Sequence, residues 1–250
     1  MENKPHISFK AQEIFQIFNF PITNSVLTSL IVVLIFFVFA FFYYRDKDKP
    51  AQERSMIYYF VAFVVKALYQ FFYSVLGPKI DSYFPLLASF FLFILFNNWF
   101  GLLPGVGSIM LKITEHGTTH YAPILRGGTA DLNTTISLAI ISVVFTNIAS
   151  IQILGFKKFV ARFYRLKDPM SYFIGTLEVI SEFSKVVSFS FRLFGNIFAG
   201  EVLLSVISFL IPVFAAFPFL LLEVFVGFIQ AIVFSTLSAV FINVAIEEHH

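Results

Sequence analysis

The stretch NSVLTSLIVVLIFFVFAFFYY, residues 24–44, decides what kind of protein this chain is. It is uninterrupted by charge and has the length of about 20 residues that an α-helix needs to cross a hydrocarbon layer of about 30 Å. The two tyrosines at its end are typical of the boundary between lipid and water. We therefore predict a membrane-spanning helix over residues 24–44.

The composition extends this interpretation to all 250 residues. Hydrophobic residues make up 58% and charged residues 13%, and a soluble domain could not bury so much apolar surface in one core. The net charge is only +2 and the aromatic residues follow apolar segments, so nothing indicates nucleic-acid binding. The absence of cysteine excludes disulfides and thiol chemistry. We expect an all-α polytopic membrane protein with a single membrane domain over residues 1–250.

Four further apolar segments are long enough to cross. We expect spans over residues 83–103 and 134–156, followed by two longer helices over residues 170–211 and 215–246. As straight helices the last two would measure roughly 63 and 47 Å, so they must tilt strongly or break. Pro212 and Pro218 bracket the turn between them. We therefore predict a long, strongly tilted helical hairpin.

Residues 51–77 differ from the other apolar segments because their polar residues share one helical face. These residues are Gln52, Ser55, Tyr59, Lys66, Gln70 and Tyr73. Such a stripe is typical of a helix that lies in the headgroup layer. We expect about five membrane-crossing helices plus this amphipathic interfacial helix, which begins near Ala51, and the alternative is that residues 51–77 cross.

The distribution of Lys and Arg predicts the orientation. If residues 51–77 lie flat, ten basic residues fall on one side and four on the other, whereas a crossing helix would divide the same residues eight to six. The larger group is Arg45, Lys47, Lys49, Arg54, Lys79, Lys157, Lys158, Arg162, Arg165 and Lys167, and the smaller is Lys4, Lys10, Lys112 and Arg126. We place the N-terminus outside and the C-terminus in the cytoplasm.

The helix over residues 170–211 carries polar side chains along one face. At 100° per residue, Glu178, Ser181, Lys185, Ser188 and Asn196 all lie close to the direction of Arg192. Such groups can simply satisfy one another within a bundle. Arg192 is different, because it stands 25 residues after Lys167 and 20 before Pro212 and cannot reach either surface.

The carboxylates of the same helix are too far away to balance Arg192. Glu178 lies about 21 Å along the axis, and Glu201 lies about 13 Å away on the opposite face. We therefore expect the counter-charge to come from another chain. The hairpin register predicts two contacts: Arg192 with Gln230, and Glu201 with Glu223. Two neighbouring carboxylates hold one proton more tightly than an isolated acid, as a proton relay requires.

Two geometries remain open for these contacts, because Glu201 points away from Arg192. Either the two helices coil around each other, or Gly195 and Gly200 permit a local distortion. A separate group, Glu115, His116 and His120, has a spacing compatible with a metal ion, but no further ligand accompanies it. We interpret these as ordinary loop residues and expect no metal and no cofactor.

The segment LEVISEFSKVVSFSFRLFGNIFAGE, residues 177–201, resembles subunit a of the F-type ATP synthase, most specifically in RLFGN followed by AGE. Supporting matches are FNNWFGLLPG (96–105), GTADLNTTISLA (128–139), GFKKF (155–159), the region of Gln230 and the EEH of residues 247–249. They cover most of the chain after residue 80. Because TADLNTT looks more like bacterial and plastid members, the resemblance implies a bacterial cell (inner) membrane protein.

The resemblance implies a non-catalytic subunit that conducts protons. Arg192 would be the stator arginine that faces the carboxylates of a rotating ring of c subunits. Asn196, Glu201, Glu223 and Gln230 would line the outside half-channel, and Glu178, Ser181 and Ser188 would border the inside half-channel. The chain departs from many bacterial relatives in carrying Glu223 where they have histidine.

The partners implied by the resemblance are the c-ring, the peripheral stalk subunit b, the rest of the ATP synthase and the lipid bilayer. An alternative is an ion-coupled secondary transporter with a charged site at the midplane. Transporters of that class usually contain inverted repeats and discontinuous helices, and we detect neither in the sequence. A second alternative is a structural subunit whose polar stripe only holds helices together.

Overall fold

The structure is a computed structural model that describes residues 11–17, 20–103, 106, 109–115, 118–163, 169–211 and 216–247. Most of these residues are helical. The α-helices are α1 (Asn24–Asp46), α2 (Met56–Leu76), α3 (Ile80–Leu102), α4 (Leu132–Leu154), α5 (Phe156–Phe163), α6 (Pro169–Leu210) and α7 (Ala216–Glu247). The 3₁₀ turns are η1 (Ala51–Glu53), η2 (Gly77–Lys79) and η3 (Gly128–Ala130).

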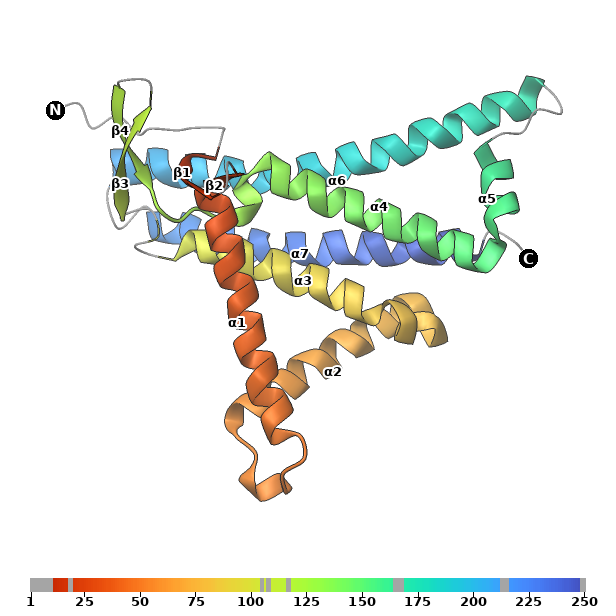
Figure 1. The fold of residues 1–250 in the computed structure, drawn as a ribbon, viewed down its shortest axis with the longest axis horizontal. Coiled ribbons are helices and arrows are strands. Elements are labelled where there is room, and N and C mark those ends of the chain that lie inside the picture. The colour runs from red at the N-terminus through yellow and green to blue at the C-terminus, as the bar shows by residue number, and fades with distance from the viewer. Residues whose placement is uncertain are drawn as a thin grey trace.

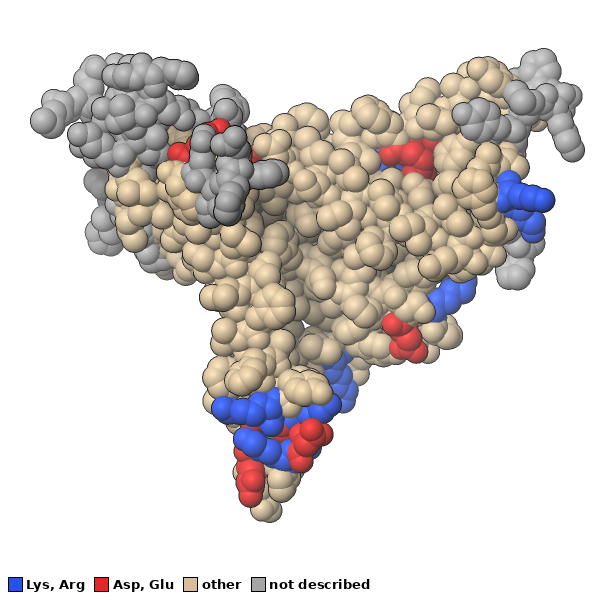
Figure 2. Space-filling view, in the orientation of Figure 1, with Lys and Arg blue, Asp and Glu red and all other residues tan. Residues whose placement is uncertain are grey.

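Five helical stretches of the described residues are long and apolar enough to cross a membrane. They cover residues 24–46, 56–102, 132–154, 170–210 and 216–246. The predicted all-α polytopic class is therefore confirmed. Figure 2 agrees with this class, since the charged side chains of this face gather mainly at the corner where α1 meets α2.

Four helices, α3, α4, α6 and α7, run along the long axis of the molecule, and α1 crosses them at an angle (Figure 1). Two antiparallel β-hairpins, which the sequence did not predict, lie toward the left end of this helical layer in Figure 1. They pair β1 (Glu13–Ile17) with β2 (Phe20–Thr23), and β3 (Met110–Glu115) with β4 (Thr118–Pro123). The short helix α5 lies at the opposite end (Figure 1).

The helix that we expected from Ala51 begins at Met56, because Ser55 is its N-cap and accepts a hydrogen bond from the Tyr58 amide at 3.3 Å. Its polar positions Tyr59, Lys66, Gln70 and Tyr73 are exposed, whereas Leu68, Phe72 and Leu76 are buried. The exposed surface of α2 also includes Phe60, Phe63 and Phe71, and the location of this helix in the headgroup layer stays a prediction.

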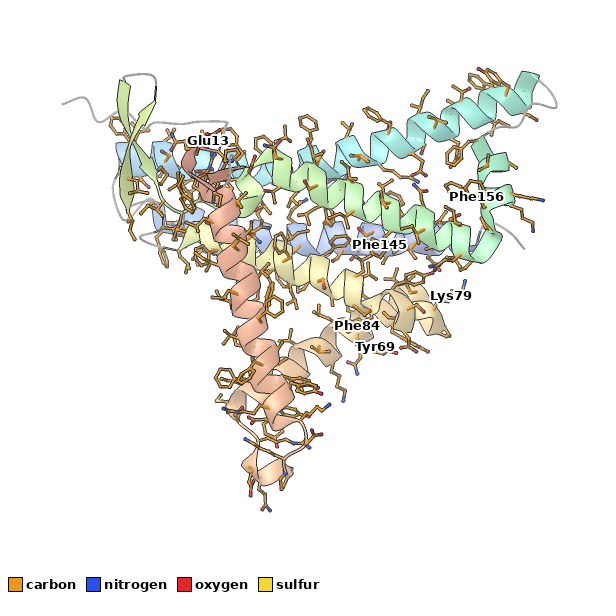
Figure 3. All side chains as sticks on the ribbon, in the orientation of Figure 1. Glu13, Tyr69, Lys79, Phe84, Phe145 and Phe156 are labelled. Carbon is orange, nitrogen blue, oxygen red and sulfur yellow. The ribbon has the colours of Figure 1, made fainter. Side chains whose placement is uncertain are left out.

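The turn between α2 and α3 depends on Gly77, whose φ of 58° lies in the region that favours glycine. Aromatic packing reinforces this turn (Figure 3). The rings of Tyr69 and Phe84 meet edge to face with centroids 5.3 Å apart, and the Tyr69 hydroxyl donates to Asp81 Oδ1 at 2.7 Å. The chain thus returns along α3 toward the core.

The core is built on α7, with buried residues from α2, α3, α4 and α6 around it. The Phe234 ring of α7 is 5.4 Å from that of Phe90 and 4.9 Å from that of Phe189, measured between centroids. Phe189 and Leu193 are one helical turn apart on α6 and both are buried. Their burial fixes the rotation of α6 about its axis and leaves Arg192 on an exposed flank.

Gly128 lies where a side chain has no room. A Cβ at this position would overlap Asn97 Oδ1 and Ser29 Oγ, which are hydrogen-bonded to each other at 3.1 Å. We expect Gly128→Ala to destabilise the chain by about 1–3 kcal/mol, because the overlap forces the neighbours apart. The measurement is the melting temperature of the chain purified in detergent. Gly195→Ala is the matched control, since nothing lies within 4 Å of a Cβ there, and equal losses in both variants would contradict the assignment.

Candidate functional site

Arg192 is the residue around which the candidate site is built. Its Nη2 donates a hydrogen bond of 3.4 Å to Ser188 Oγ, one turn earlier on α6. No described carboxylate forms an ion pair with it. A guanidinium stays protonated at physiological pH, so the charge cannot be removed by losing a proton. The described part of the chain therefore presents an unbalanced positive charge on its surface.

Gln230 approaches this region from α7. It is buried, and its Oε1 accepts a hydrogen bond of 2.8 Å from Asn196 Nδ2. We expected Arg192 as its partner, and the structure instead gives the residue one turn further along α6. The amide pair links α6 to α7 beside the guanidinium.

Glu223 lies against Gly200 rather than against Glu201. Its carboxylate occupies the space that a Cβ on Gly200 would take, so only glycine at this position leaves room for it. Glu223 is 6% exposed. Together with the contact between Asn196 and Gln230, this shows that the hairpin brings Glu223 and Gln230 of α7 against α6.

Glu201 turns to the other side of α6, where its partner is Arg126. The Arg126 Nη2 lies 2.8 Å from Glu201 Oε2, and its Nε lies 3.1 Å from both carboxylate oxygens. Glu223, which the hairpin register places beside Glu201, forms no hydrogen bond with it among the described contacts. The ion pair accounts for the direction of the Glu201 side chain, which points away from Arg192 to meet a different cation.

Arg126 belongs to a buried segment between β4 and α4. Its backbone amide donates to Thr28 Oγ1 of α1 at 3.2 Å. The following residue, Gly127, packs against Gly101 of α3, where a Cβ would come within 3.0 Å of the opposite backbone. Thr129 then donates to Asn98 Oδ1 at 2.5 Å. The segment is therefore fixed on two helices before α4 begins.

Sequence reasoning counted Arg126 only as a cation of an outside loop. Two glycines follow it directly, and such a pair permits close approach of the backbone to a neighbouring element. This was the signal that could have marked the segment as packed. The signal does not reveal the partner, which lies 75 residues further along the chain.

A cavity of about 380 Å³ lies between α3, α6, α7 and the segment that carries Arg126. Its polar lining consists of Asn98, Arg126, Glu201, Ser205, Ser208 and Glu223. Val106 and Pro123 also line it, which places the cavity at the end of the helical layer that carries the β3–β4 hairpin (Figure 1). Water in this cavity would contact both carboxylates.

The residues predicted for the inside half-channel follow α6 in the opposite direction. Ser181 and Ser188 are exposed and Glu178 is half-buried. An ion pair lies between Ser181 and Ser188: Lys185 Nζ binds Glu182 Oε1 at 2.7 Å, with side chains 19% and 14% exposed. Glu182 was not part of the predicted stripe. Lys185 also lies 4.9 Å from the centroid of the Phe241 ring on α7.

The residues considered for a metal do not form a described site. The side chains of Glu115, His116 and His120 lie outside the described part of the chain. Among the side chains that are described, no group of three or more His, Cys, Asp and Glu residues is placed to hold a metal ion.

These features define an integral, multi-pass membrane protein with a charged site on its long helix α6. The chain belongs to the ATP synthase A chain family, because the family model of that description matches residues 26–243. The predicted resemblance is therefore confirmed. Membership makes the chain a component of the membrane sector of the F-type ATP synthase, with a role in proton transport and ATP synthesis, and not a catalytic subunit by itself.

Three relatives show the breadth of the similarity. The subunit a of Oedogonium cardiacum chloroplasts is 39% identical over 166 residues, which cover 66% of this chain and 60% of the relative. The subunit a of Syntrophobacter fumaroxidans is 35% identical over 192 residues, covering 76% and 72%. The chloroplastic subunit a of Bigelowiella natans is 32% identical over 238 residues, covering 94% and 91%.

The pair formed by Glu182 and Lys185 gives a test of charge balance inside α6. Lys185→Met should destabilise the chain by roughly 3 kcal/mol, because it leaves a largely buried carboxylate without its cation. Glu182→Gln combined with Lys185→Met should recover part of the loss, since no charge is then uncompensated. Melting temperatures of the chain in detergent measure both effects. A double variant no more stable than Lys185→Met would show that the pair is not coupled.

Proposed function

We propose that this chain provides two offset aqueous half-channels to a ring of c subunits, with Arg192 as the barrier that ties proton flow to rotation of the ring. One observation carries the proposal: Arg192 keeps a permanent charge on an exposed flank of α6, and no described carboxylate of the chain balances it. Such a charge within a membrane helix is costly unless it faces water or an anion.

A guanidinium performs this role because it cannot pass a proton on. A ring carboxylate that approaches Arg192 is stabilised in its ionised form, by about 4 kcal/mol at 4 Å with an effective dielectric constant of 20. It therefore releases its proton to the inside path before it passes. The next carboxylate is reloaded from the outside path and enters lipid in its neutral form.

The outside path runs from the cavity toward Arg192. Glu223 faces the cavity, and Gln230 lies seven residues further along α7, about 10 Å along the axis. The hydrogen bond between Gln230 and Asn196 then crosses to α6, one turn from Arg192. Glu201 lines the same cavity. These four residues support a polar route between the helices.

The inside path approaches Arg192 from the other end of α6. Ser188, Ser181 and Glu178 lie about 6, 16 and 21 Å from Arg192 along the helix axis. Because the outside residues lie on the C-terminal side of Arg192 along α6 and the inside residues on its N-terminal side, the two paths are offset along the helix. A proton can then cross only by travelling on the ring.

We further propose the partners and placement that the family implies. These are the c-ring and the peripheral stalk subunit b, a bacterial cell membrane, an outside N-terminus and a cytoplasmic C-terminus. A secondary transporter is less well supported, because α6 and α7 are continuous over Pro169–Leu210 and Ala216–Glu247 and lack the breaks on which transporter sites are usually built.

Substitution of Arg192 tests the barrier. In assembled ATP synthase, Arg192→Ala and Arg192→Lys should abolish ATP-driven proton pumping into inverted vesicles, because the charge and its fork geometry are lost or altered. Lys66→Ala, which removes an exposed cation of α2, is the control and should pump normally. If Arg192 only holds helices together, both variants would lower the amount of assembled enzyme and leave pumping per complex intact.

A further inference from the structure

We propose that α5, Phe156–Phe163, is a membrane-surface helix that binds anionic phospholipids, with Lys157 and Lys158 at the phosphate groups and Phe156 among the acyl chains. The partner is a lipid of the leaflet that surrounds the end of α4. Neither Arg192 nor the two half-channels enter this proposal, which goes beyond the proton path. Three features of α5 support it: its position, its two faces and its charge.

α5 begins at the boundary between lipid and water. The preceding helix, α4 (Leu132–Leu154), has 23 residues and measures about 34 Å, close to the roughly 30 Å of a hydrocarbon core. A membrane-crossing α4 therefore reaches the headgroup layer near Leu154, and α5 starts two residues later. In Figure 1, α5 lies at the end of the helical layer, between the end of α4 and the start of α6. Lipid headgroups are thus the immediate surroundings of α5.

Gly155 sets the direction of α5. Its amide closes the last turn of α4 by donating to the Ile151 carbonyl at 2.9 Å, and its φ of 80° lies in the region that favours glycine. Its own carbonyl accepts a hydrogen bond of 3.1 Å from the Phe159 amide, which begins α5. The chain therefore turns at a single residue, and α5 lies at an angle to α4 instead of continuing it away from the membrane (Figure 1).

The sequence of α5, FKKFVARF, separates apolar from basic residues around the helix. The apolar residues follow the spacing i, i+3, i+4, i+7 that forms a single face. They are Phe156, Phe159, Val160 and Phe163. Lys157 and Lys158 lie about 100° and 200° around the helix from Phe156. An amphipathic helix of this kind lies in the plane of the membrane surface with its apolar face toward the acyl chains.

The apolar face of α5 is only partly covered by the rest of the chain. Phe159 and Phe163 are half-buried and meet edge to face, with ring centroids 5.2 Å apart. Phe156 is 67% exposed (Figure 3). Insertion of this ring among acyl chains removes apolar surface from water, which is favourable. The exposed part of the face is therefore available to lipid.

The positive charge of α5 is not balanced within the described part of the chain. The helix contains three basic residues and no acidic one. Lys157 and Lys158 are exposed, and no described ion pair or hydrogen bond includes either of them. At the corner where α1 meets α2, in contrast, Arg45 and Lys49 both bind the buried Asp46. Figure 2 shows basic side chains at the end of the molecule that carries α5.

An anionic phospholipid meets both requirements of α5 at once. Its phosphate offers an anion to the lysines, and the acyl chains directly below it offer an apolar partner to Phe156. Lysine side chains reach the phosphate layer readily, because a long apolar stem carries the ammonium group. Each lysine at this depth favours binding to an anionic membrane by about fivefold. A zwitterionic headgroup carries no net charge and gives little of this gain.

The test uses the full chain reconstituted into bilayers of equal parts phosphatidylglycerol and phosphatidylcholine. Phe156→Trp in a Trp99→Phe background places the single tryptophan of the chain on α5. Bromine on a lipid quenches tryptophan fluorescence, and each of the two lipids is brominated in turn. Phosphatidylglycerol should show an apparent association constant at least about fivefold higher than that of phosphatidylcholine. The chain with native Trp99 as its reporter on α3 is the reference, and there the two lipids should quench equally.

Charge variants identify the groups responsible for the preference. Lys157→Gln combined with Lys158→Gln should remove it, whereas Lys157→Arg combined with Lys158→Arg should retain it. Lys66→Gln removes an exposed cation of α2 and is the matched control, which should retain the preference. An ionic strength of about 1 M should weaken the preference, because the Debye length is then about 3 Å.

Melting temperatures in detergent give a second readout that needs no tryptophan reporter. Added phosphatidylglycerol should raise the melting temperature of the unsubstituted chain more than phosphatidylcholine does, because a ligand that binds the folded state stabilises it. The paired glutamine variant should lose this difference between the two lipids.

Equal quenching of the α5 reporter by both lipids would overturn the proposal, as would a preference that survives the loss of both lysines. A third contrary outcome concerns intact ATP synthase. If the paired glutamine variant assembles poorly while its lipid preference is unchanged, the lysines serve a protein partner and not a lipid.

Discussion

The charge of Arg192 is the constraint on which the arrangement of this chain depends. Hydrocarbon cannot solvate a guanidinium, and the residue is too far from both ends of α6 to reach water by extending its side chain. Phe189 and Leu193, one turn apart, bury themselves against the core and so fix the flank from which Arg192 projects. The packing of these two apolar side chains therefore determines the side of α6 on which the Arg192 guanidinium lies. Because the surrounding membrane cannot solvate that charge, the guanidinium needs water or an anion as its partner.

Three cations lie within or beside the long hairpin, and comparison among them separates structure from function. Lys185 is balanced by Glu182 on the same helix, and Arg126 is balanced by Glu201 across a tertiary contact. Only Arg192, among the cations described in this region, lacks a carboxylate. The chain is able to pair its buried charges, so the exception points to a partner outside the chain.

Hydropathy alone predicted most of the helices. The ranges 24–44, 170–211 and 215–246 differ from α1, α6 and α7 by at most two residues at either end, because long apolar segments and flanking prolines are local signals. The β-hairpins and α5 were missed, since short elements between spans leave little periodic pattern. Glu223 and Gln230 were correctly brought to α6 by hairpin register. The partner of Glu201 was not, because Arg126 is distant in sequence and is placed by packing rather than by periodicity.

The contact between Gly200 and Glu223 has a mechanical consequence. The Glu223 carboxylate lies where a Cβ on Gly200 would be, so a side chain of α7 packs directly against the backbone of α6 at this point. Both helices are continuous, and the bond between Asn196 and Gln230 lies only about 6 Å further along the axis of α6. A side chain at position 200 would displace the Glu223 carboxylate from this contact, because the atoms that it would overlap are the end of the Glu223 side chain. The missing side chain at position 200 therefore allows an acid of α7 to lie against the backbone of α6, one turn from the Asn196–Gln230 bond.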